Sequence, residues 1–71
     1  MVEVDARGLL CPQPLIEARK ALQPAEVKQI RVLVDDATAL ENICRFGRSQ
    51  GCAVEVETAG VEHHITITRG E

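Results

Sequence analysis

Hydrophobic and polar residues alternate along four short stretches of the chain. Val2 and Val4 alternate with acidic residues, and apolar residues recur at every second position within residues 30–34 and 52–56. His63, Ile65 and Ile67 alternate with more polar neighbours in the same way. A period of two is typical of a strand with one buried face. The pattern therefore predicts four strands, each with one apolar face and one largely polar face.

A helical period separates the first two of these stretches. Leu15, Ala18 and Leu22 fall on one stripe, which predicts a helix from about Pro12 to Leu22. Proline is favoured at the first helical position because the N–H that it lacks has no partner within the helix. The helix should end at Gln23, because the residue before a proline is disfavoured in the α region.

A second helical pattern covers residues 39–50. Either Asp36 or Thr38 is expected to cap its N-terminus, with Glu41 completing a capping box if Thr38 is the cap. Gly51 should end it. The residues on its apolar face are Leu40, Ile43, Cys44 and Gly47.

The predicted order is βαβαββ. Strands covered on both faces would show continuous apolar runs, whereas these strands alternate. We therefore expect an α/β (α+β) fold: a two-layer sandwich in which both helices cover one face of a four-stranded mixed sheet. The last two strands should form an antiparallel hairpin, and residues 1–71 should form a single domain.

Composition narrows the range of functions. The 71 residues carry a formal charge of −3, and Phe46 is the only aromatic residue, which argues against direct nucleic-acid binding. No apolar run approaches the roughly 20 residues needed to span a bilayer, and the N-terminus does not resemble a signal peptide. We therefore expect a cytoplasmic protein that contacts no membrane, in which the three cysteines form no disulfide framework.

Cys11 stands directly before the first predicted helix. The positive end of the helix dipole would stabilise a thiolate there and lower its pKa. Pro12 and Pro14 offer no N–H, so the N–H of Gln13 is the expected donor to the sulfur. Arg7, Arg19 or Lys20 are candidates to add positive charge. These features are compatible with a reactive thiol and equally with an inert buried one.

The other candidate residues favour structural roles. Cys44 and Cys52 lie on apolar faces, where burial is expected. His63 and His64 should point to opposite faces of a strand, and no closely spaced ligand pairs predict a metal site. Asp35 and Asp36 are better explained by helix capping than by acid–base or metal chemistry.

The segment Asp-Ala-Arg-Gly-Leu-Leu-Cys-Pro-Gln-Pro, residues 5–14, resembles the signature of the TusA/SirA family of sulfur-carrier proteins, whose motif is Cys-Pro-x-Pro. The similarity continues through the basic pair Arg19 and Lys20, residues 34–36 and the last strand. Residues 34–43 most resemble the YedF-like branch linked to selenium metabolism. The resemblance implies the βαβαββ sandwich already predicted from the residue pattern.

The resemblance also implies a function. Cys11 would accept sulfane sulfur or selenium as a transient persulfide, with no other cofactor, from a cysteine desulfurase or a rhodanese. It would pass this cargo to a DsrE-like or other acceptor, for example in tRNA thiolation. Pro12, Gln13 and Pro14 would shape the site, with Asp5, Arg7 and Gly8 in the supporting loop. Such a protein is a carrier rather than a free-standing enzyme; the alternative is a non-catalytic regulatory or interaction module.

Overall fold

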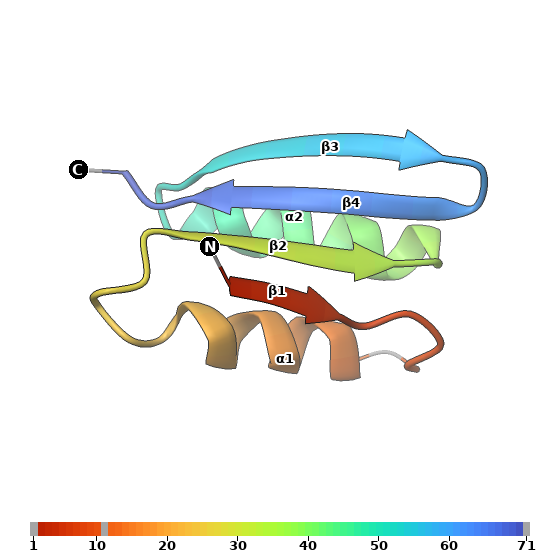
Figure 1. Cartoon of the computed structure of the whole chain (residues 1–71), viewed down its shortest axis with the longest axis horizontal. Helices are drawn as coiled ribbons and strands as arrows, with labels where there is room; N and C mark the ends of the chain where they lie inside the picture. The colour runs from red at the N-terminus through yellow and green to blue at the C-terminus, as the bar shows by residue number, and fades with distance from the viewer. Residues whose placement is uncertain (1, 11, 71) are drawn as a thin grey trace.

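The computed structural model describes residues 2–10 and 12–70. Its elements follow the predicted order: β1 (Val2–Asp5), α1 (Gln13–Leu22), β2 (Gln29–Val34), α2 (Ala37–Ser49), β3 (Ala53–Ala59) and β4 (Glu62–Thr68) (Figure 1). The prediction of a βαβαββ chain is confirmed.

The four strands form one mixed sheet in the order β1-β2-β4-β3. β1 runs parallel to β2, while β4 lies between β2 and β3 and is antiparallel to both. The C-terminal strand is therefore central, and β3 forms one edge of the sheet. The predicted β3–β4 hairpin is confirmed.

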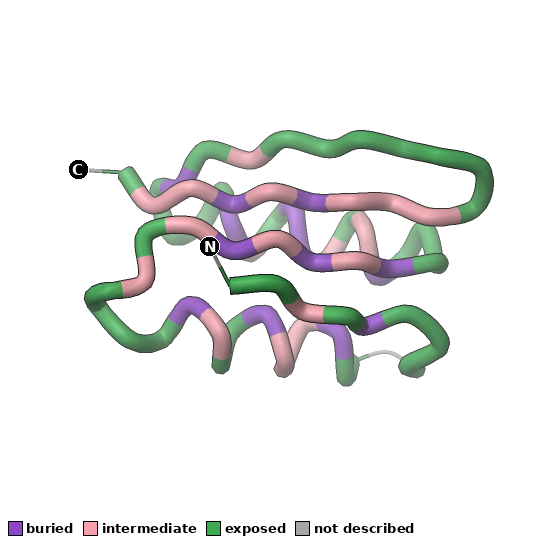
Figure 2. The backbone as a smooth tube through the Cα atoms, in the orientation of Figure 1, coloured by how far each residue is buried: buried purple, intermediate pink, exposed green. Residues whose placement is uncertain are grey.

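The core lies between the sheet and the two helices (Figure 2). Alternate residues of the two central strands are buried, namely Ile30, Val32, Val34, Ile65 and Ile67. The helices bury Ala18, Leu22, Ala39, Ile43 and Cys44 against them. Arg31 and His64, at the intervening positions, are only half-buried on the other face. Both helices thus cover one face, and the opposite face is open, as predicted.

The helix boundaries differ slightly from the prediction. α1 begins at Gln13, and Pro12 is its N-cap rather than its first residue. α2 begins at Ala37, two residues earlier than predicted, because the Asp36 carboxylate accepts the N–H of Ala39 at 3.0 Å. Asp36 is therefore the cap, and the alternative of a capping box from Thr38 to Glu41 is wrong.

β3 departs most from the expected pattern. Cys52 is buried as predicted but precedes the strand, which begins at Ala53. Val54 is half-buried, whereas Val56 is 44% exposed. The alternation predicted a buried Val56, but a strand at the sheet edge has a neighbour on one side only, so its outer side chains are covered less.

Gly47 brings α2 close to the sheet. A Cβ atom at this position would lie 2.7 Å from Cγ2 of Val54 and 3.3 Å from Cδ1 of Ile67. The absence of a side chain therefore sets the spacing between α2 and the two strands beneath it.

Candidate functional site

Residues 6–10 form the connection from β1 toward α1. Cys11 itself lies outside the described residues, so the geometry on both sides of it defines the site. Ala6 donates its N–H to the Leu33 carbonyl at 2.8 Å and is buried, which fixes the start of the connection to β2. On the far side, Pro12 occupies the N-cap position of α1 without a side-chain capping bond, and Pro14 is buried within the first turn.

Arg7 joins the end of one strand to the beginning of another. Its guanidinium donates to both Asp5 oxygens at 2.9 Å and to Oε2 of Glu62 at 3.0 Å. Asp5 ends β1 and Glu62 begins β4. The hydrogen bonds from Arg7 lower the pKa of Asp5 to about 2, and the same side chain is the main cause of a lowered pKa at Glu62. All three groups are therefore charged at neutral pH.

Asp35 holds the next residue of the connection. Its Oδ1 accepts the N–H of Gly8 at 3.1 Å, and Gly8 has a φ of +79°, which favours glycine. Asp35 and Asp36 thus have separate tasks, since the first holds this connection and the second caps α2. The capping interpretation is confirmed for Asp36, while Asp35 and Glu62 are site residues that sequence reasoning missed.

The N–H of Gln13 has a different partner from the one predicted. It donates to the Leu10 carbonyl at 2.8 Å. The expectation that this group would be directed at a sulfur is therefore not supported by its geometry. Pro14 has no N–H, so neither of the first two residues of α1 offers a free N–H. The helix dipole contributes positive potential at this end of the helix.

Apolar side chains are exposed beside the site. Leu10 is 82% exposed and Leu9 38% exposed. Val61, which precedes Glu62 in the β3–β4 turn, is 77% exposed. The ion pair between Arg7 and Glu62 brings this turn to the same end of the molecule as residues 6–10. Exposed apolar side chains are thus gathered at this end of the molecule, a feature typical of contact surfaces.

The basic residues predicted to assist Cys11 are placed elsewhere or already paired. Arg7 is neutralised by two carboxylates. Arg19 and Lys20 lie six and seven residues beyond Gln13, the first residue of α1, which is roughly 9 Å or more along the helix axis. Both instead line a hollow of about 470 Å³ between the C-terminal halves of α1 and α2.

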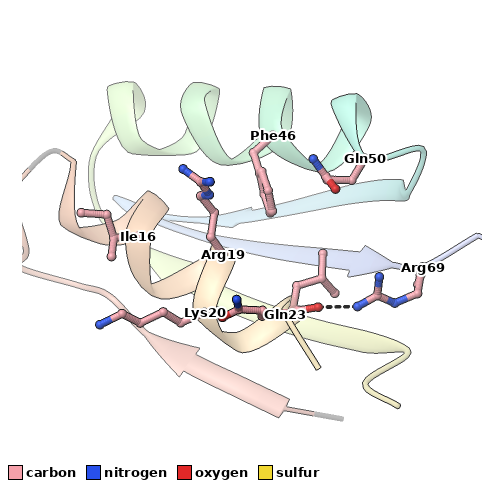
Figure 3. A pocket seen from close by; sticks show the side chains of 8 residues that line it. Ile16, Arg19, Lys20, Gln23, Phe46, Gln50 and Arg69 are labelled. Carbon is pink, nitrogen blue, oxygen red and sulfur yellow. Dashed lines mark hydrogen bonds between the residues drawn. The ribbon is translucent and has the colours of Figure 1, made fainter. Parts of the chain in front are cut away.

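We call this hollow and its continuation toward Leu15 and Asn42 the α1–α2 groove. In Figure 3, Arg19, Phe46 and Gln50 point into the space between the helices, and Arg69 reaches back to the carbonyl of Leu22. Arg69 is held by backbone carbonyls, whereas Arg19 and Lys20 make no ion pair with any described residue. The groove therefore combines the single aromatic ring with free positive charge.

Cys44 and Cys52 are both buried free thiols. Burial raises the pKa of Cys44, so this thiol stays protonated at neutral pH. The predicted structural role of both residues agrees with their burial.

His63 and His64 are directed to opposite faces of β4. His63 shares the side of the buried Ile65 and bonds to Thr58, while His64 contacts Arg31 and Glu62 on the open face. Within residues 2–10 and 12–70, no three histidine, cysteine or acidic side chains are grouped as metal ligands would be. No helix in the same ranges has the length and apolar character of a membrane span.

Comparison with known proteins identifies the family. The family model described as sulfurtransferase TusA matches residues 2–69. This chain belongs to the TusA family. Residues 5–14 lie inside the matched region, so the resemblance of that segment to the Cys-Pro-x-Pro signature agrees with the match along the whole chain.

Individual relatives support the same assignment. A protein of Archaeoglobus fulgidus, named as a candidate sulfur carrier, is 46% identical over 44 residues, covering 61% of this chain and 57% of its own length. One from Methanocaldococcus jannaschii, named in the same way, is 38% identical over 55 residues, 76% of this chain and 73% of its own. The crystal structure of a SirA-like protein from Desulfitobacterium hafniense superposes over 100% of both chains with a TM-score of 0.87 at 32% identity.

Proposed function

We propose that this protein carries a sulfane sulfur atom as a persulfide on Cys11 and relays it between proteins. The observation that carries the proposal is the family match over residues 2–69, which contains the Cys-Pro-x-Pro segment. The two relatives named as candidate sulfur carriers support it.

The proposed transfer is a thiol exchange that needs no external oxidant or reductant. The Cys11 thiolate attacks the outer sulfur of a donor persulfide, the S–S bond of the donor breaks, and the donor thiolate leaves. Cys11 then holds the sulfur as its own persulfide. An acceptor nucleophile attacks the terminal sulfur in the same manner and releases the Cys11 thiolate.

The described residues suit a site that must meet two partners in turn. Hydrogen bonds to Leu33 and Asp35 anchor the backbone of residues 6–8, and Arg7 ties it to Glu62. Leu10 remains exposed for contact. An anchored backbone with exposed apolar side chains lowers the ordering cost of each docking event.

The proposed donor is a cysteine desulfurase or a rhodanese, and the proposed acceptor is a DsrE-like or similar protein in the cytoplasm. The α1–α2 groove would extend the docking surface, since its free cations suit an acidic partner. Selenium would travel by the same chemistry if the donor presents it as the outer atom of an S–Se bond: the Cys11 thiolate attacks that selenium, the S–Se bond of the donor breaks, and the donor thiolate leaves. Selenium metabolism and tRNA thiolation are the two proposed routes for the cargo.

The test is loading followed by intact mass measurement under non-reducing conditions. The protein is incubated with a cysteine desulfurase and cysteine, and the wild type is expected to gain the mass of one sulfur atom. Cys11→Ser should gain nothing, whereas Cys44→Ser and Cys52→Ser should load as the wild type does. Loading that persists in Cys11→Ser, or no loading of the wild type by desulfurase or rhodanese donors, would overturn the proposal.

A further inference from the structure

β3 presents an uncovered edge of the sheet. It pairs with β4 along residues 53–59 in a continuous one-to-one register, and no described strand lies on its other side. Its seven residues include no proline, and the register includes no bulge. Alternate backbone N–H and C=O groups of such a strand face outward and can pair with an added strand.

The side chains of β3 differ in chemistry between the two faces of the sheet. On the open face, Glu55 and Glu57 stand beside a hollow of about 320 Å³, which Arg31, His64 and Thr66 also line. On the helix face, Val56 is 44% exposed. A strand added at this edge would therefore lie opposite an acidic residue, an aliphatic residue and a second acidic residue, namely Glu55, Val56 and Glu57.

The negative charges of Glu55 and Glu57 are compensated little by positive charges of other described residues. Glu55 makes no ion pair with any described residue. Among the described residues, the single ion pair of Glu57 is with Arg31, at 3.9 Å, and the Glu57 side chain is 80% exposed. Cross-strand pairs of opposite charge favour pairing, and like charges oppose it.

We propose that β3 binds an extended segment of another protein in which two basic residues flank one aliphatic residue. The basic side chains would lie opposite Glu55 and Glu57 over the hollow, and the aliphatic side chain would cover Val56. The outward backbone groups of β3 would supply the affinity, and the three side chains would supply the specificity.

The same residues disfavour a second copy of this chain as the occupant. Antiparallel pairing of two β3 strands centred on Val56 places each Glu55 opposite a Glu57 of the other copy. Two like-charge pairs would then face each other across the new ladder, which is destabilising. The charges thus protect the edge from self-pairing while favouring a basic segment.

The position of β3 permits simultaneous use of the candidate site. β1, which leads into residues 6–10, lies at the opposite edge of the sheet. A segment added to β3 therefore leaves the connection between β1 and α1 accessible. The β3 edge would tether the carrier to a partner while residues 6–10, which follow β1 at the opposite edge of the sheet, stay available for exchange of cargo.

The probe for this proposal is the acetylated and amidated peptide Thr-Lys-Val-Lys-Val-Thr. It is titrated into the full ¹⁵N-labelled chain carrying Cys11→Ser, so the result does not depend on sulfur transfer. We expect shift changes and slowed amide exchange concentrated in residues 53–59. The double variant Glu55→Lys/Glu57→Lys should bind this peptide about tenfold more weakly, and should instead bind Thr-Glu-Val-Glu-Val-Thr.

The matched control is Glu3→Lys, which reverses a charge on the same sheet face at the other edge and should leave the affinity unchanged. Peptide-induced shifts outside β3 and β4, or equal affinity of the double variant for both peptides, would overturn the proposal. So would concentration-dependent shifts of β3 without peptide, because these would make a second copy the occupant.

Discussion

Arg7 organises the candidate site at the scale of single residues. Its ion pairs with Asp5 and Glu62 are exposed, and exposed pairs contribute little to global stability. Their effect is local, because they join β1, residues 6–10 and the β3–β4 turn. Arg7 is thus a positioning residue for the backbone that precedes Cys11.

The first prediction concerns the carboxyl group of Asp5. Its pKa of about 2 lies below the ordinary 3.8, so its contact with Arg7 stabilises the fold above about pH 4 and is lost as pH falls through about 2. The titration midpoint, followed by NMR of the side-chain carboxyl carbon, should be near 2 in the wild type. In Arg7→Gln it should return toward 3.8, and an unchanged midpoint would contradict this assignment.

The sequence predicted the residues of this hydrogen-bond network that lie before Cys11, but not their partners elsewhere in the chain. Asp5, Arg7 and Gly8 stand within the segment that resembles the family signature, so they were predicted as the supporting loop. Glu62 is 55 residues from Arg7 and Asp35 is 27 residues from Gly8, and no local pattern links them. Such partners follow from strand order, which places β4 at the centre of the sheet.

At the scale of elements, hydrophobic periodicity located all six helices and strands. The errors lie where tertiary position decides the outcome. Asp36 caps α2 because it follows β2 directly, and Val56 is exposed because β3 is an edge strand. The alternation of residues predicts β3 as a strand, but it does not predict that β3 lies at the edge of the sheet.

The second prediction concerns the N-cap of α2. Asp36→Ala removes the acceptor of the Ala39 N–H and should lower the free energy of unfolding by about 1 kcal/mol. Asp36→Asn, which keeps a capping oxygen, should retain most of the stability. Urea denaturation followed by circular dichroism measures both, and equal losses in the two variants would argue against a capping role.

The third prediction concerns the contact between α2 and the sheet. Gly47→Val inserts methyl groups where Val54 and Ile67 already lie, and overpacking should cost about 2 kcal/mol or more. Arg48→Val, at an exposed position of the same helix, should cost only about 0.5 kcal/mol through helix propensity. Equal denaturation midpoints for the two variants would show that the close approach of α2 to the sheet does not require glycine at position 47.

At the scale of the whole molecule, charge is distributed unevenly over the two faces. Free cations line the α1–α2 groove, whereas Glu3, Glu55 and Glu57 lie at the edges of the open sheet face. The net charge of −3 conceals this division. Each face therefore suits a partner of opposite sign, and a carrier with two such surfaces can distinguish donor from acceptor.

The fourth prediction concerns the basic groove. Arg19→Gln/Lys20→Gln should slow sulfur loading from a cysteine desulfurase roughly threefold to tenfold at low donor concentration, and added salt should slow the wild type more than the variant. Loading at saturating donor should be unchanged, because the thiol is untouched. Lys28→Gln/Arg48→Gln removes the same charge outside the groove lining and should behave as the wild type. Equal slowing of both double variants would show a general charge effect instead.

The most direct test of the central claim locates the transferred sulfur within the chain. After loading by a cysteine desulfurase, alkylation and tryptic cleavage without reductant place the three cysteines in separate peptides, residues 8–19, 32–45 and 49–69. We predict that only the peptide of residues 8–19 carries the added sulfur atom and that the other two carry alkylated thiols alone. Added sulfur on the peptide of Cys44 or Cys52, with none on that of Cys11, would contradict the account.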